Sequence, residues 1–200
     1  MRIPLWLKIA WTAFVAVWIP VAWDFYGAQV FLHFCALGNL MILVALWTES
    51  PLVISWQAVS LLVFQSLYAL DVVATVASGR HAIGGTEYLF RASAPLPIRL
   101  FSLYHFVAPI VVVWTLLRLG YDKRGWLLGV VALVVVLPIN YVWRPGHDVN
   151  WARGPFFHEQ HVVPGWLYLA AYGVIVPLVV YLPTHLVLRR LVRPRELTFG

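Results

Sequence analysis

The sequence predicts an all-α, polytopic integral membrane bundle of about six transmembrane helices, formed by a single domain over residues 1–200. Three observations predict this fold. The chain is 62% hydrophobic and only 11% charged, whereas about a quarter of the residues of a soluble domain are charged. Its apolar residues form blocks close to the ~20 residues that a helix needs to cross a bilayer. Most basic residues lie at the ends of these blocks, as membrane topology requires.

The apolar blocks and the turns between them locate the helices. We expect helices at approximately residues 3–23, 28–48, 51–77, 97–119, 125–143 and 164–188. The segment Asp24–Gly27 is a tight turn, and Pro51 suits the first position of the third helix. Pro138 is expected to kink the fifth helix, and the sixth contains Pro177 and Pro183.

The Lys and Arg residues predict the orientation. With a cytoplasmic N-terminus, nine basic residues fall on the inner side and five on the outer side. This bias favours two cytoplasmic termini in a cell membrane, such as the bacterial inner membrane. The polar loops at residues 78–96 and 144–163 then lie outside. No small-residue cleavage site follows Arg2 and Lys8, so we interpret the first apolar block as a retained helix.

The composition argues against several other classes of function. The net charge is +6, but the basic residues form no exposed face interleaved with aromatic residues. We therefore expect membrane lipids as partners and not nucleic acid. The single cysteine, Cys35, excludes an internal disulfide and a multi-cysteine metal site. No feature predicts a cofactor or the oligomeric state.

The segment from Pro97 to Gly120 contains the main functional signal. It has no Lys, Arg, Asp or Glu between Arg99 and Arg118, and His105 lies within this apolar span. An ionisable side chain at membrane depth is costly, and it usually faces a bundle interior or a water-filled cavity. The alternative is a structural role, in which a neutral imidazole hydrogen-bonds to a neighbouring helix.

Other polar residues are expected at the same depth as His105, in the outer leaflet. They are Cys35, Asn39, Tyr68, Asp71, Tyr104 and Asn140, with Asn150 in the covering loop. We therefore predict a polar pocket that opens to the outer leaflet. On a continuous second helix, His33 would be rotated away from Cys35.

These polar residues also have purely structural interpretations. Asp71 could pair with Arg80 or Arg99 near the interface. Asn39 could form a hydrogen bond between helices, which contributes roughly 0.6–2 kcal/mol. Cys35 could be a small buried apolar residue.

Three hypotheses describe the chemistry of the pocket. In the first, His105 is the general base of a lipid acyl hydrolase or acyltransferase. Cys35 is then the nucleophile, because an adjacent base readily activates a thiol. Asn39, Tyr104 or Asn140 could stabilise the oxyanion.

In the second hypothesis, His158 and His161 bind a metal, together with Asp148, His147 or His105. This spacing is a weak signal, and the HExxH motif is absent. In the third, His33 and His105 are axial haem ligands. A rival of a different class is a non-catalytic binder or transporter of a small amphiphile, which would use the same polar groups to recognise a head group.

Some segments resemble known families. Val149–Pro155 and Val163–Tyr168 are similar to the last loop and helix of bacterial six-helix membrane proteins of the YwaF-like kind, as is Leu103-Tyr104-His105. Over nearly the whole chain, short bacterial membrane-associated proteins of unassigned activity are more similar. They share Ala45–Pro51 and Tyr181–His185.

The YwaF-like proteins in turn resemble animal six-helix membrane hydrolases and acyltransferases. Those proteins pair a Thr or Cys on an early helix with a His on helix four. The resemblance implies Cys35 as the nucleophile and His105 as the base. It departs from the family pattern on the second helix, where Cys35 does not align clearly with the nucleophile position.

Overall fold

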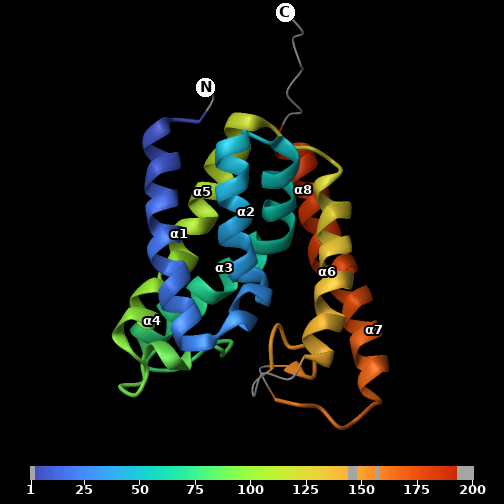
Figure 1. The fold of residues 1–200 in the computed structure, drawn as a ribbon. Helices are drawn as coiled ribbons and strands as arrows, with labels where there is room; N and C mark the ends of the chain where they lie inside the picture. The colour runs from blue at the N-terminus through green and yellow to red at the C-terminus, as the bar shows by residue number, and fades with distance from the viewer. Residues whose placement is uncertain (1–2, 144–147, 156–157, 193–200) are drawn as a thin grey trace, which may run out of the picture.

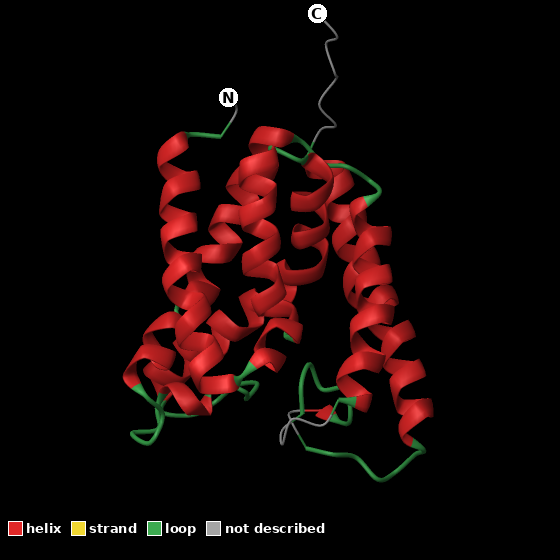
Figure 2. Cartoon of the chain, viewed as in Figure 1, coloured by secondary structure: helices red, strands yellow, loops and turns green. Residues whose placement is uncertain are grey.

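A computed structural model describes residues 3–143, 148–155 and 158–192. The elements of this part of the chain are helical (Figure 2), which confirms the predicted all-α fold. In chain order they are α1 (Leu5–Tyr26), η1 (Ala28–Leu32), α2 (Phe34–Thr48), α3 (Pro51–Ser78), η2 (Glu87–Leu89), α4 (Leu96–Phe101), α5 (Tyr104–Leu119), α6 (Gly125–Val142), α7 (Gly165–Val176), η4 (Pro177–Tyr181) and α8 (Leu182–Leu191). Elements η1 and η2 are 3₁₀-helical, whereas η4 is π-helical.

Five helical segments are long and apolar enough to cross a membrane. They are Leu5–Tyr26, Pro51–Ser78, Leu96–Leu119, Gly125–Val142 and Gly165–Leu191. Large apolar side chains are also exposed along these segments, among them Val76 at 73% and Val142 at 78%. An apolar surface of this kind suits contact with lipid and not with water. The fold is therefore that of a multi-pass membrane protein.

The helix ends follow from local chemistry. Pro51 is the first residue of α3, and the Ser50 hydroxyl accepts a hydrogen bond from the Val53 N–H at 3.3 Å. This is an N-cap, which satisfies a backbone donor that the helix itself leaves unpaired. At the other end of α3, Gly79 adopts a φ of 71°, a left-handed conformation that favours glycine and ends the helix.

Helix α3 is the centre of the bundle and packs against α2, α5 and α6. Figure 1 shows α1, α2 and α5 on one side of the molecule and α6, α7 and α8 on the other. The first residue of α6 approaches α3 closely, because a Cβ on Gly125 would lie 2.7 Å from the Ser55 carbonyl carbon. A Cβ on Gly129 would lie 2.7 Å from the Ser60 hydroxyl. The Gly125-x-x-x-Gly129 spacing thus allows close helix contact, as it does in other membrane bundles.

The two ends of the bundle differ. The end that we call the turn end carries the short connections at residues 49–50 and 120–124, and α1 begins and α8 ends there (Figure 1). It is closed by polar contacts. Lys8 is 3% exposed and its Nζ lies 2.8 Å from Glu49 Oε1. The Tyr121 hydroxyl is 2.7 Å from His185 Nδ1. The opposite end, the loop end, carries residues 79–95, 148–155 and 158–164.

Three predicted helices are interrupted. The block expected at residues 28–48 is divided into η1 and α2 by His33, which has extended backbone angles. The block at 97–119 is divided into α4 and α5 around residues 102–103. The last block contains the π-helical turn η4, which begins at Pro177. The first two interruptions, at His33 and at residues 102–103, border the site described next.

Candidate functional site

The loop end of the bundle contains a cavity of about 410 Å³, which we call the His105 cavity. Helices α1, α2, α3 and α5 contribute to its wall, as does the loop after α3. Its polar lining residues are Tyr26, His33, Cys35, Tyr68, Tyr88, Ser102, Tyr104 and His105. Its described lining includes no Asp, Glu, Lys or Arg. The structure therefore brings His105, Cys35, Tyr68 and Tyr104, four of the residues singled out in the sequence, to one uncharged cavity.

The His105 ring is held between two tyrosines. Its centroid lies 4.0 Å from that of Tyr68 and 4.1 Å from that of Tyr104, and both pairs are stacked. His105 Nδ1 is 2.8 Å from the Ser102 carbonyl oxygen. A carbonyl can only accept, so Nδ1 carries the proton and donates it. Nε2 is then the basic nitrogen of the ring, and it has no hydrogen-bond partner within the described chain.

The break between α4 and α5 makes this arrangement possible. The Ser102 carbonyl accepts from the His105 side chain at 2.8 Å and from the His105 backbone N–H at 3.2 Å. A continuous α-helix would direct the same carbonyl to the N–H four residues further on. The irregular turn therefore fixes both the tautomer and the orientation of the imidazole.

Tyr68 connects the histidine to the loop that covers the cavity. Its hydroxyl lies 2.7 Å from the hydroxyl of Tyr88, which follows the third transmembrane segment. Burial raises the pKa of Tyr88 to about 12, so this side chain remains a neutral hydroxyl at physiological pH. The cavity consequently offers several hydrogen-bonding groups, and its described lining contains no carboxylate, ammonium or guanidinium group.

Cys35 contributes to the same cavity without direct contact with His105. It lines the cavity together with Tyr104, whose ring stacks on the imidazole. No hydrogen bond joins Cys35 to His105 in the described part of the chain. A nucleophile and its base require such contact, so the catalytic roles of Cys35 and His105 stay predictions.

The expected separation of His33 from Cys35 is wrong. Both residues line the His105 cavity. The prediction assumed a continuous helix, whereas His33 has φ and ψ angles of −67° and 130°. Because this extended residue interrupts the helix, the helical rotation between positions 33 and 35 does not apply. The two histidines of the haem hypothesis, His33 and His105, thus border one cavity.

Asn150 and Asn140 hold this helix break and do not line the His105 cavity. The Asn150 carboxamide accepts from the Phe34 N–H at 2.9 Å and donates to the Leu32 carbonyl at 2.6 Å. Asn140 Nδ2 also approaches the Leu32 carbonyl, at 3.4 Å. These bonds replace those that a continuous helix would make. Asn140 and Asn150 therefore contribute to the His105 cavity only indirectly.

We expect Asn150→Leu to loosen the wall of the His105 cavity. The substitution leaves the Phe34 N–H without its partner and removes the shorter of the two bonds to the Leu32 carbonyl. This should lower the free energy of unfolding by about 2 kcal/mol. Maleimide should then alkylate Cys35, the only cysteine, faster than in the wild type. Asn150→Asp, which retains an acceptor for Phe34, should be intermediate. If Asn150→Leu kept the wild-type rate of Cys35 alkylation and the wild-type free energy of unfolding, these bonds would not support the cavity.

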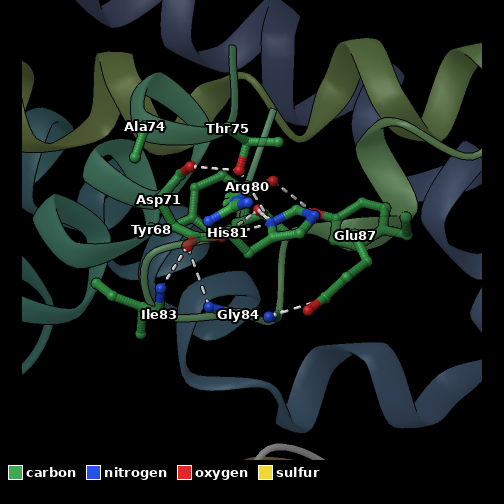
Figure 3. A network of polar contacts seen from close by, with 12 residues as sticks. Tyr68, Asp71, Ala74, Thr75, Arg80, His81, Ile83, Gly84 and Glu87 are labelled. Atoms are coloured by element: carbon green, nitrogen blue, oxygen red, sulfur yellow. Dashed lines mark hydrogen bonds and ion pairs between the residues drawn. The ribbon is translucent and has the colours of Figure 1, made fainter. Parts of the chain in front are cut away.

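Asp71 organises the covering loop (Figure 3) and is 1% exposed. Its Oδ1 accepts from the Ile83 N–H at 2.6 Å and the Gly84 N–H at 3.0 Å. Its Oδ2 interacts with His81 Nδ1 at 3.0 Å and accepts from the Thr86 hydroxyl. Figure 3 shows His81 and Gly84 gathered around the carboxylate.

The alternative in which Asp71 pairs with Arg80 or Arg99 is not found among the described residues. His81 and loop backbone donors occupy its carboxylate, while Arg99 Nε donates to the Leu89 carbonyl at 2.6 Å. Asp71 also does not line the cavity. By holding the loop, it positions Tyr88, so its support of the site is again indirect.

Asn39 lies one helical turn beyond Cys35, beneath the cavity. It is completely buried, and its backbone carbonyl accepts from Trp11 Nε1 at 3.1 Å. Neither polar atom of its side chain has a hydrogen-bond partner among the described residues, and the same holds for Gln65. Asn39 is not among the residues that line the His105 cavity, and its role in stabilising an oxyanion stays a prediction.

The two histidines considered as metal ligands, His158 and His161, are exposed in the loop between α6 and α7. The described residues contain no group of three or more His, Cys, Asp or Glu side chains that could hold a metal ion. His147, the other candidate in this loop, lies outside the described residues.

Comparison of the chain with protein-family models, curated proteins and solved structures gives no match. The resemblance to bacterial six-helix membrane proteins stays a prediction. A functional interpretation consequently depends on the His105 cavity and its chemistry.

Proposed function

We propose that this chain binds a small membrane amphiphile in the His105 cavity. The observation that carries the proposal is the fixed His105 tautomer at the wall of an uncharged cavity. Nε2 can accept a hydrogen bond, while the tyrosine hydroxyls can donate or accept. Concave, mostly apolar cavities with a few convergent polar groups are typical ligand sites.

The absence of formal charge in the described lining defines the class of ligand. A net charge buried there would have no counter-ion and would be costly. We therefore infer a neutral polar end with a hydroxyl or amide donor for His105 Nε2. The surrounding helices supply an apolar medium, so the rest of the ligand is hydrocarbon.

We further propose that the chain lies in the cell membrane with both termini cytoplasmic. The excess of Lys and Arg at the turn end supports this orientation, with nine basic residues against five in the sequence. The His105 cavity then opens in the outer leaflet, and its ligand enters from that leaflet or from outside the cell.

A lipid acyl hydrolase or acyltransferase is the second candidate. The fixed tautomer of His105 also suits a general base, and Cys35 borders the same cavity. Catalysis would require side chains to move or a water molecule to connect the thiol with Nε2, because no hydrogen bond joins Cys35 to His105 among the described residues. Binding requires no such change, so we place it first.

We expect His105→Ala to weaken ligand binding about tenfold, since a buried hydrogen bond contributes about 1.4 kcal/mol. The measurement is competition by monoacylglycerol against a photoreactive monoacylglycerol, with purified protein in detergent. The matched control is His158→Ala, which removes an exposed histidine and should retain wild-type affinity. Equal affinities in wild type and His105→Ala would contradict the proposed role of Nε2.

Activity-based labelling separates the two candidates. A lipid-like fluorophosphonate and iodoacetamide would be applied to wild type, Cys35→Ala and His105→Ala. Labelling that disappears in both variants would establish a thiol–imidazole pair and favour the enzyme. Cys35 labelling that persists in His105→Ala would indicate an accessible thiol and favour the binder.

A further inference from the structure

A second cavity of about 190 Å³ lies beside the His105 cavity. We call it the Leu133 cavity. It is bordered by α2, α3, α6, α7 and η4, and its apolar lining includes Leu61, Phe64, Leu133 and Val176. It extends the site from the α1–α5 side of the bundle towards the α6–α8 side.

The two cavities have different chemistry. The described lining of the Leu133 cavity contains no Asp, Glu, Lys or Arg. Asn150 borders it, but its carboxamide already bonds to the backbone of Leu32 and Phe34. The remaining walls are mainly aliphatic and aromatic, so hydrocarbon is a better occupant than a polar group.

His33 and Cys35 line both cavities. They lie at the break between η1 and α2, where extended backbone replaces a turn of helix. The boundary between the two spaces is thus formed by side chains around this break. On the other side of the Leu133 cavity, Val176 precedes the π-helical turn, an irregularity that often accompanies functional sites.

We propose that the ligand is a single-tailed amphiphile that occupies both cavities. This inference depends on the function proposed above. The polar head hydrogen-bonds in the His105 cavity, and the hydrocarbon tail passes Cys35 into the Leu133 cavity.

Two photoreactive monoacylglycerols test this placement. One carries a diazirine next to the glycerol ester and the other carries it at the end of the acyl chain. After irradiation of the full chain in detergent, the modified residues are identified by mass spectrometry. We expect the head probe to label Tyr68 or Tyr88, and the tail probe to label Leu61, Phe64 or Leu133. Excess unlabelled monoacylglycerol should suppress both.

Val176→Phe provides the matched variant, because a larger side chain at this buried position should fill part of the Leu133 cavity. The added ring would occupy space that the tail needs, so tail labelling in the Leu133 cavity should fall about tenfold. Head labelling should stay at the wild-type level, which also shows that the variant is folded. The control is Val179→Phe, at a position that is 66% exposed; neither probe should be affected.

The outcomes separate this inference from the proposed function. Competed head labelling, combined with tail labelling only at exposed positions such as Val179, would overturn the two-cavity placement and retain ligand binding. Tail labelling in the Leu133 cavity that is unchanged in Val176→Phe would also overturn the placement. Absence of competed labelling by either probe would overturn both the placement and the proposed function.

Discussion

We expect Asp71→Ala to lower the free energy of unfolding by about 3 kcal/mol. The carboxylate receives two backbone N–H groups and the Thr86 hydroxyl and interacts with His81. Hydrogen bonds to a charged group contribute about 1.5–3 kcal/mol each, and loss of the acceptor leaves several donors unpaired together. Water can hydrogen-bond to some of the released donors in the loop, which limits the decrease in the free energy of unfolding. Thermal and denaturant unfolding in detergent measure the effect.

The same substitution should release the loop after α3. Limited proteolysis is therefore expected to cut residues 79–91 of Asp71→Ala faster than those of the wild type, and monoacylglycerol binding should weaken because Tyr88 is no longer held. Asp24→Ala removes an exposed aspartate near the end of α1 and is the matched control. If Asp71→Ala kept wild-type unfolding and protease resistance, the network in Figure 3 would have no stabilising role.

We expect Gly125→Val to separate α6 from α3 and to destabilise the bundle by about 3 kcal/mol, at the upper end of the usual cost of overpacking. An added Cβ would lie 2.7 Å from the Ser55 carbonyl carbon and 2.7 Å from the Trp56 backbone nitrogen. Backbone atoms cannot rotate away as a side chain can, so the helices themselves must move.

Gly173→Ala is the control for this prediction. Gly173 lies within α7, and an added Cβ would meet nothing within 4 Å. Alanine is a better helix former than glycine by about 1 kcal/mol, so this variant should be as stable as the wild type or slightly more stable. Comparable losses of stability in Gly125→Val and Gly173→Ala would show that close α3–α6 packing is not the cause.

Much of the fold could be predicted because helix length and apolar pattern are local properties. The same reasoning predicted the depth of Cys35, Tyr68 and His105, since each position follows from its distance to a helix end. Helical spacing alone was therefore enough to predict that these three side chains lie at a similar depth. The Gly125-x-x-x-Gly129 spacing was also present in the sequence, but the prediction did not use it.

Long-range contacts explain what could not be predicted. Nothing near His33 in the sequence indicates a helix break, because the compensating partner, Asn150, is more than a hundred residues away. The loop after α3 has no periodicity, so its positioning of His81 and Tyr88 could not be derived from spacing. Gly84 and Gly85, which have positive φ angles there, were among the local signals of a loop, but they do not determine its contacts.

The shortness of helix α2 has a consequence for biogenesis. Helix α2 has 15 residues, or about 22 Å at 1.5 Å per residue, compared with about 30 Å for the hydrocarbon core. Backbone that is not α-helical is tolerated at membrane depth only where protein or a water-filled cavity surrounds it. Here the required partner is Asn150, which the ribosome adds only after α6. During synthesis, the break between η1 and α2 therefore lacks this partner until most of the chain has been made.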